Sequence, residues 1–246
     1  LTGTDKRFYE GGATYGKSTY TTHQYDKYGN VKTFADAGDT PASDDVAASI
    51  EYSWLDPVCE ANHIVGLARK IEVFGNSALM RHRQATIDCS SGDVKQVRQY
   101  LADGKVAVTD LDYFPNGNLK TVTGPANKNS QRYVLSYEYD PVVVSHVARI
   151  ADSFGLNSTA THNYLFGKVE TTTDTNNNQR TYLYDSVGRV EKIYGPYEQG
   201  EGTATLAFEY ALVKTPAVDG QGNIVPLSEV PWALTRHVDK DVGGAY

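Results

Sequence analysis

A short pattern of aromatic, glycine and apolar residues recurs along this chain and constrains its fold more than any other feature. In each copy an aromatic residue lies four places before a glycine, and apolar residues lie two and five places after that glycine. The clearest copies run from Tyr25 to Phe34, from Tyr113 to Val122 and from Tyr184 to Ile193. Such repetition predicts a series of similar supersecondary units in place of a single globular core.

Each copy of the pattern predicts a β-hairpin. Asp185 can accept hydrogen bonds from backbone amides ahead of it, and Gly188 tolerates the left-handed conformation that closes such a turn. Strands are therefore expected on both sides. The apolar places two and five after the glycine, Val190 and Ile193, fall on opposite faces of a regular strand. Either the strand is bulged there or both of its faces are covered.

A second turn alternates with the first. Asp152 and Gly155 recur as Asp174 and Asn177, asparagine being the residue that best replaces glycine in a left-handed position. One unit is thus strand, turn, strand, turn in about twenty residues. The residues assigned to repeat turns are Tyr25, Asp26, Gly29, Tyr113, Gly117, Asp152, Gly155, Gly167, Asp174, Asn177, Tyr184, Asp185 and Gly188.

These copies resemble the RHS repeat family, also called YD repeats after the Tyr-Asp pair that opens the turn. Tyr25-Asp26-x-x-Gly29 and Tyr184-Asp185-x-x-Gly188 match its signature, whereas Tyr113-Phe114 lacks the aspartate and Tyr139-Asp140-Pro141 lacks the turn glycine. The resemblance covers most of residues 20–200. Long irregular spacers, such as Ala35 to Val65, look most like the B component of insecticidal Tc toxins and related large secreted bacterial proteins.

The resemblance implies an all-β fold in which serial antiparallel hairpins form a curved sheet strip, part of a larger shell. It implies a non-catalytic structural segment of a secreted RHS-repeat protein, whose hollow shell encloses a toxin or other polypeptide. Expected partners are adjacent repeats of the parent chain or a partner toxin subunit, and the enclosed cargo. The expected location is secreted or at the bacterial cell surface. The family's self-cleaving Asp-Pro-x-Gly signature is absent, since Asp56-Pro57 continues with Val58-Cys59.

The repeat signal divides the chain into three expected parts. Residues 1–19 form an N-terminal flanking segment, 20–200 the repeat strip, and 201–246 continuing degenerate hairpins with a turn at Asp219–Ile224. A short helical turn is expected at Asp45–Ser49. The opening Leu1-Thr2 is neither an initiator methionine nor a signal peptide, so we interpret the chain as part of something longer.

Composition excludes some classes of protein. Asp and Glu outnumber Lys and Arg 30 to 23, and the net charge of −7 argues against a nucleic-acid partner. No apolar run approaches the roughly 20 residues of a membrane span. Eighteen tyrosines and 22 glycines suit strands and turns.

The two cysteines allow two interpretations. Cys59 and Cys89 could form a disulfide, which in a secreted chain would contribute about 3 kcal/mol, or they could be two unrelated small buried residues. Their spacing does not resemble a zinc site.

Catalytic and cofactor signals are poor, so neither an enzyme nor a cofactor is expected. The sequence has no nucleophile elbow, metalloprotease motif or phosphate loop. The lone histidines His23, His146 and His162 are best explained as packed or solvent-facing. Asp174-x-Asn176-x-Asn178 with Asp185 imitates a calcium loop, but Gln179 replaces the required glycine, which favours a plain polar turn.

The main alternative function is a carbohydrate or cell-surface binding module. Exposed tyrosines on repeated hairpins could stack on sugars, so glycans are possible partners. Pairing of the tyrosines across strands as structural rungs is the favoured interpretation.

Overall fold

The structure, a computed structural model, describes residues 2–38, 44–211, 217–218, 224–225 and 232–238. These residues fold almost entirely into antiparallel β-strands, which confirms the predicted all-β series of hairpins. Two compact units are present, Leu1–Ser136 and Tyr137–Tyr246. Strand β10 (Arg132–Tyr139) contains the boundary between them.

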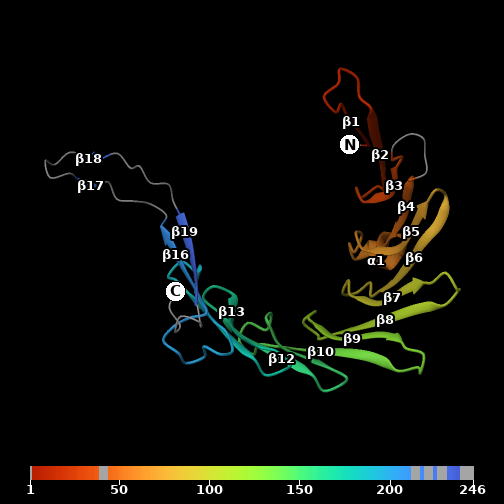
Figure 1. Cartoon of the computed structure of the whole chain (residues 1–246). Coiled ribbons are helices and arrows are strands. Elements are labelled where there is room, and N and C mark those ends of the chain that lie inside the picture. Colours follow the sequence, from red (N-terminus) through yellow and green to blue (C-terminus); the bar gives the residue numbers. More distant parts are fainter. Residues whose placement is uncertain (1, 39–43, 212–216, 219–223, 226–231, 239–246) are drawn as a thin grey trace. The chain divides into compact units, whose positions relative to one another are not determined.

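In the first unit, each strand pairs antiparallel with the next strand of the chain (Figure 1). An insert between β4 and β5 holds the 3-10 helix η1 (Ser53–Leu55) and the short helix α1 (Pro57–Ala61). The strands are β1 (Gly3–Phe8), β2 (Lys17–Tyr25), β3 (Val31–Asp36), β4 (Val46–Tyr52), β5 (Ala68–Gly75), β6 (Ala78–Ile87), β7 (Val94–Tyr100), β8 (Val106–Tyr113) and β9 (Leu119–Ala126).

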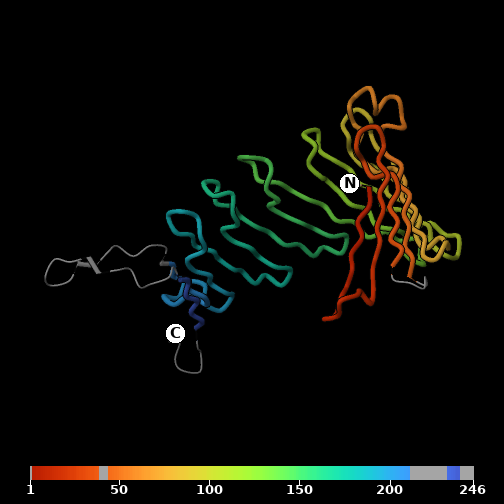
Figure 2. The backbone as a smooth tube through the Cα atoms, turned by 90° about the horizontal axis from the view of Figure 1, so that it is seen from above, coloured from red at the N-terminus to blue at the C-terminus, as the bar shows by residue number. Residues whose placement is uncertain are grey.

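The second unit continues the same plan, and Figure 2 shows its backbone running back and forth in successive hairpins. Strand β16 pairs with β19, while β17 and β18 form a separate two-stranded pair. The strands are β11 (Val147–Asp152), β12 (Asn157–Asn163), β13 (Lys168–Thr173), β14 (Gln179–Tyr184), β15 (Val190–Tyr194), β16 (Leu206–Ala211), β17 (Ala217–Val218), β18 (Ile224–Val225) and β19 (Trp232–His237).

The described residues bury very few apolar side chains. Cys59 and Ala204 are the only hydrophobic residues among them that are buried, each at 1% exposure. Most strand residues are half-buried. The fold is therefore held mainly by backbone hydrogen bonds between neighbouring strands and by side-chain pairs across them.

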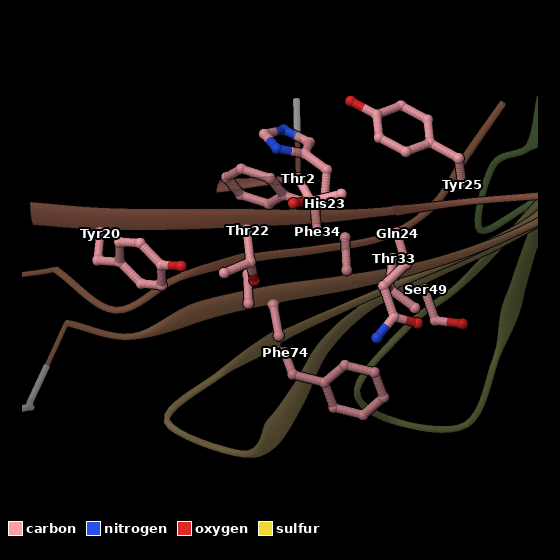
Figure 3. A pocket seen from close by; sticks show the side chains of 13 residues that line it. Thr2, Tyr20, Thr22, His23, Gln24, Tyr25, Thr33, Phe34, Ser49 and Phe74 are labelled. Atoms are coloured by element: carbon pink, nitrogen blue, oxygen red, sulfur yellow. The ribbon is translucent and has the colours of Figure 1, made fainter. Parts of the chain in front are cut away.

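A β-bulge follows the turn in seven hairpins and decides on which face the apolar residues of the repeat lie. Between β2 and β3, Tyr25 pairs with Val31 and His23 pairs with Phe34, so the register skips one residue. Tyr25 and His23 share a face, as Figure 3 shows, and their cross-strand partners share it with them. The strand is therefore bulged, and the residues two and five after the glycine lie on the same face.

In the seven bulges that follow a turn, the skipped residue is charged in all but one, where it is Met80. The skipped residue lies directly after the first paired residue of the second strand, and it is an extra residue with no direct partner opposite it. In seven hairpins the skipped residues are Lys32, Arg69, Met80, Lys95, Lys120, Glu170 and Glu191.

One local expectation differs from the structure. The helical turn expected at Asp45–Ser49 is wrong, because Val46–Tyr52 forms β4 and pairs with β3 and β5. The expected N-terminal flanking segment contains β1 and the start of β2, which pair as a hairpin. Of the turn expected at Asp219–Ile224, residues 219–223 lie outside the described residues.

The division between the two compact units falls between Ser136 and Tyr137. Strand β10 carries the same strand pattern on both sides of this point, so no pattern in the sequence predicted a division there.

Two turn glycines allow a sharp test of the hairpin geometry. Gly117 and Gly188 have φ of +85° and +83°. A Cβ on Gly117 would meet nothing within 4 Å, whereas a Cβ on Gly188 would lie 2.8 Å from the Phe166 ring. Gly117→Ala should therefore lower the free energy of unfolding by about 1 kcal/mol for the left-handed backbone alone. Gly188→Ala should lower it clearly further, and Ser186→Ala should be near neutral. Equal losses at the three positions in denaturant melts would contradict the turn assignment.

Candidate functional site: the contact between successive hairpins

The hairpin turns share one hydrogen-bonding pattern. The amide of Gly188 donates to the carbonyl of Asp185 at 3.0 Å, and the amide of Asp185 donates to the carbonyl of Arg189 at 2.9 Å. The Asp185 carboxylate accepts the amides of Val187 and Arg189 at 3.0 and 2.8 Å. The same carboxylate contacts are made by Asp26, Asp152 and Asp174.

The residue that closes each turn has a left-handed backbone. The five predicted turn glycines have φ between +62° and +87°, and Asn177 has φ of +62°. In the copy that lacks the aspartate, the amide of Gly117 still donates to the carbonyl of Phe114 at 2.9 Å. The predicted turn residues are spread along the two units and do not gather into one cluster.

The oxygens of the possible calcium loop are used within its own turn. Asp174 accepts the amides of Asn176 and Asn178 on one oxygen and the Asn178 side chain on the other. The amide of Asn178 contributes most to holding the pKa of Asp174 below its usual range. Asp185 pairs with Arg189 at 2.6 Å. Across the described ranges, no three His, Cys, Asp or Glu side chains are grouped so that they could hold a metal ion.

Tyrosine hydroxyls link one hairpin to the hairpin before it. In the second unit, the hydroxyl of Tyr184, the last residue of β14, donates to the carbonyl of Val169 at the start of β13. Tyr210 of β16 donates to the carbonyl of Val190 in β15 at 2.9 Å. In the first unit, the equivalent pairs are Tyr52 with Val31 at 2.9 Å and Tyr113 with Val94 at 3.1 Å.

The acceptor is the same structural position each time. Val31, Val94, Val169 and Val190 each lie directly before the skipped residue of a bulge. A bulge disrupts the ladder locally, and the tyrosine of the following hairpin supplies a donor at that point. Burial raises the pKa of the three hydroxyls of Tyr52, Tyr113 and Tyr184, which keeps them protonated as donors. We call these four pairs the tyrosine contacts.

Cations cover the rings of three of these tyrosines. The Lys95 ammonium lies 5.0 Å from the centre of the Tyr113 ring, and the Arg189 guanidinium lies 4.4 Å from that of Tyr210. The Lys168 ammonium lies 5.5 Å from the Tyr184 ring and donates to the carbonyl of Gly188. Each ring is therefore held both by its hydroxyl and by a cation–π contact.

The loop after β10 lacks the turn glycine and is organised by the carboxylate of Asp140 instead. Asp140 is 3% exposed. Its two oxygens accept the amides of five successive residues, at 2.7 to 3.3 Å, from Val142 to His146. Burial opposes ionisation, but these amides together hold the pKa of Asp140 far below its usual range. A single ionised side chain thus shapes the whole loop.

A disulfide and a polar cluster hold the insert of the first unit. Cys59 of α1 is bonded to Cys89, with their Cα atoms 4.5 Å apart. Glu60 pairs with Lys27 and accepts the Tyr28 hydroxyl at 2.6 Å. The indole of Trp54 donates to the carboxylate of the first repeat aspartate at 2.6 Å. The insert is thereby fastened to the β2–β3 turn and to the β6–β7 turn.

An open groove of about 810 Å³ crosses the first unit over β2 to β5 (Figure 3). Tyr20 and Tyr25 line it at 51% and 41% exposure. His23 packs against the Phe34 ring, with the ring centres 5.2 Å apart. A second groove in the second unit is lined in part by His146 and His162. Both grooves are open surfaces among the described residues.

Sequence reasoning missed the target of each tyrosine hydroxyl and the pairing of two histidines. His146 and His162, expected to be isolated, stack with their ring centres 4.5 Å apart. Such contacts depend on how the strands align, because the partners come from different strands and loops. No helix in the described part of the chain has the length and hydropathy that crossing a membrane requires.

Comparison with known proteins gives a likeness in fold. Neither a family model nor a curated protein matches the sequence. A crystal structure of TcdB2-TccC3 without its hypervariable C-terminal region matches with a TM-score of 0.55 and 16% identity, over 79% of this chain and 10% of that chain. A second TcdB2-TccC3 structure has a TM-score of 0.33, 12% identity and coverage of 79% and 15%, and carries no argument. The chain spans about a tenth of the first structure's chain and shares its β-sheet fold.

The tyrosine contacts predict a specific stability loss. Tyr184→Phe removes the donor to the Val169 carbonyl and leaves the ring in place. It should lower the free energy of unfolding by about 1 kcal/mol. Tyr197→Phe is the matched control, because Tyr197 is 84% exposed and should tolerate the change. Denaturant melts that give the same value for both variants would contradict a structural role for the hydroxyl.

The Asp140 loop predicts a pH-dependent stability. Because its pKa is lowered in the folded chain, Asp140 stabilises the fold fully above its unfolded pKa of about 3.9 and loses this contribution as the pH falls below it. Asp140→Asn should lower the melting temperature by several degrees at neutral pH, and the gap should narrow in acid. The control Asp112→Asn, on a side chain that is 58% exposed, should change little. A gap that is constant down to strongly acidic pH would contradict this assignment.

Proposed function

We propose that this chain is a non-catalytic structural segment of a secreted RHS-repeat protein. Its hairpins contribute strands to a hollow β-sheet shell that encloses a toxin or other polypeptide. The observation that carries the proposal is the likeness in fold to TcdB2-TccC3, whose chains are Tc toxin chains, at a TM-score of 0.55. The YD-type turns support the same assignment independently, since they come from the residues of this chain alone.

The side chains on the strands suit a wall that borders a cargo without binding it tightly. In the second unit, Thr161 pairs with Thr171 across β12 and β13, and Thr171 pairs with Thr181 across β13 and β14. The hydroxyls of Thr161 and Thr171 lie 2.7 Å apart and hydrogen-bond to each other. The Thr181 hydroxyl donates to the Gln199 side chain at 2.9 Å. Hydroxyls that are already hydrogen-bonded offer few free donors and little apolar area to a passing polypeptide.

The absence of catalysis is part of the proposal. The repeat aspartates are used as acceptors for turn amides, and Asp140 accepts five of them. A carboxylate with its oxygens so engaged is a poor general base. The Cys59–Cys89 disulfide supports secretion or a cell-surface location, because disulfides persist in oxidising compartments.

The proposed partners are adjacent repeats of the parent chain or a partner toxin subunit, together with the enclosed polypeptide. Strand β1 stands at one end of the series of pairings in the first unit. The amide of His23 donates to the carbonyl of Thr2, so the alternation of an antiparallel ladder turns the amides of Asp5 and Arg7 away from β2. These amides can extend the ladder with a further strand.

The second candidate is a carbohydrate or cell-surface binding module. The groove of Figure 3 favours it, because Tyr20 and Tyr25 are about half exposed beside other aromatic rings. Exposed tyrosine rings can stack on the faces of sugars.

A capture experiment tests the proposal against this alternative. The purified chain should capture the polypeptide encoded next to it in its gene, and it should bind no member of a glycan array at equal concentration. Asp5→Pro should weaken the capture, because proline removes an amide that points away from β2. Tyr20→Ala, which changes the groove and leaves that edge intact, is the matched control and should capture normally. Circular dichroism should give the same β-content for both variants.

Two outcomes would overturn the shell assignment. One is specific glycan binding in the micromolar range that Tyr20→Ala abolishes, with no capture of the neighbouring polypeptide. The other is a gene that encodes no further repeats on either side of this chain. The first outcome would also establish the binding module.

A further inference from the structure

One hairpin of the second unit holds histidine where other hairpins hold the linking tyrosine. His162 pairs with Val169, the residue directly before the skipped residue of the β13 bulge. This register position is occupied by Tyr184 opposite Val190 in β14, and by Tyr113 opposite Leu119 in β8. The register therefore assigns His162 to the place of the tyrosine contact in β12.

His162 contacts the neighbouring hairpin by ring stacking. Its ring lies 4.5 Å from that of His146, with an angle of 12° between the planes. The Tyr164 ring lies 6.4 Å from His146 at 28°. His146 ends the Asp140 loop, and its amide donates to the Asp140 carboxylate at 3.0 Å. The stack thus joins the loop between β10 and β11 to β12 and to the loop after β12.

The stack suits neutral rings. The Nδ1 atom of His162 is buried and has no hydrogen-bond partner among the described residues. Burial contributes most to lowering the pKa of His162, and the neighbouring His146 lowers it further, while Asp140 acts in the opposite direction. The Asp140 oxygens already accept five amides, so they are poorly placed to receive an imidazolium proton as well.

The charged groups around the stack do not compensate the positive charge that would arise if a second histidine ring were protonated. Arg149 pairs with Glu138 at 2.6 Å. The Asp174 carboxylate is held by its own turn. Lys168 is directed to Gly188. The titratable and charged residues that line the same groove or adjoin the two rings are Asp140, Arg149, Tyr164, Lys168, Asp174, Arg180 and Tyr182.

We propose that the His146–His162 stack is an acid-sensitive contact that holds the β10–β11 loop against β12 at neutral pH and releases it in mild acid. The four tyrosine contacts are hydroxyl bonds that do not change between neutral and mildly acidic pH. The histidine contact changes its charge in this range. Mild acid therefore loosens the second unit at the contact between the β10–β11 loop and β12, and it leaves the tyrosine contacts in place. The proposal concerns this chain alone and does not depend on the shell.

The direction of the pH effect follows from the number of protons that each state binds. A histidine whose pKa is lowered in the closed state binds fewer protons there than in the open state. Closure is fully stable above the ordinary histidine pKa of about 6.5 and weakens as the pH falls through it.

Hydrogen exchange of the full chain, read by mass spectrometry at about pH 7.5 and about pH 5.5, measures this opening. After correction for intrinsic exchange rates, protection in residues 140–146 and 162–169 should fall at least about fivefold in acid. The turn at residues 101–105 should keep its protection. Unchanged protection of the histidine segments would overturn the proposal.

Three variants separate the histidine contact from general acid sensitivity. His162→Phe keeps an aromatic ring without a proton site, and His162→Tyr restores the residue type used elsewhere. Both should remove the acid response. His82→Phe is the matched control, because His82 stacks on Tyr100 with ring centres 4.1 Å apart and has no second histidine in that stack. It should keep the response, and an acid response that persists in His162→Phe would contradict the assignment.

A titration by NMR needs no variant. The Cε1 proton of His162 should titrate below the ordinary histidine range in the intact chain. A value at or above that range would overturn the proposal even if the variants failed to fold.

Discussion

The antiparallel backbone ladder between consecutive strands is the interaction on which the rest of this structure depends. The described residues bury almost no apolar side chains, so hydrophobic burial contributes less here than in a globular domain. Each strand instead satisfies its backbone groups with its sequence neighbours. A ladder of this kind is stable only in series, because an isolated pair of strands is marginal in water.

The β-bulge adds side-chain specificity to this ladder. By skipping one residue, it brings both apolar places of the repeat to one face, and it provides the carbonyl that the next tyrosine hydroxyl binds. In the Tyr184-Asp185 pair, the tyrosine and the aspartate therefore have different tasks. The aspartate organises its own turn, whereas the tyrosine links the hairpin to its predecessor. The tyrosine contacts act between strands that no YD-type turn joins, such as β13 and β14.

The sequence predicted features whose cause is local. The aspartate that accepts amides and the glycine that needs a left-handed backbone are properties of four or five adjacent residues, so the turns could be located from residues such as Asp185 and Gly188 alone. The choice between a bulge and two covered faces stayed open because parity depends on the partner strand. The assignment of Asp45–Ser49 to a helical turn failed because pairing with β3 and β5 overrides local preference. Helix α1, which begins at Pro57 after the cap Asp56, carried a local signal that the repeat pattern obscured.

The direction of the tyrosine contact has a consequence for how such a chain can change its length in evolution. In the described strands, the donors lie at the ends of β4, β8, β14 and β16, and the acceptors lie in the strand directly before each. Duplicating a segment of two strands would copy one donor together with one acceptor and keep every later pair in phase. Duplicating a single strand would move all later tyrosines to the opposite margin, away from their carbonyls. During evolution, a chain of this architecture should therefore become longer or shorter in steps of two strands.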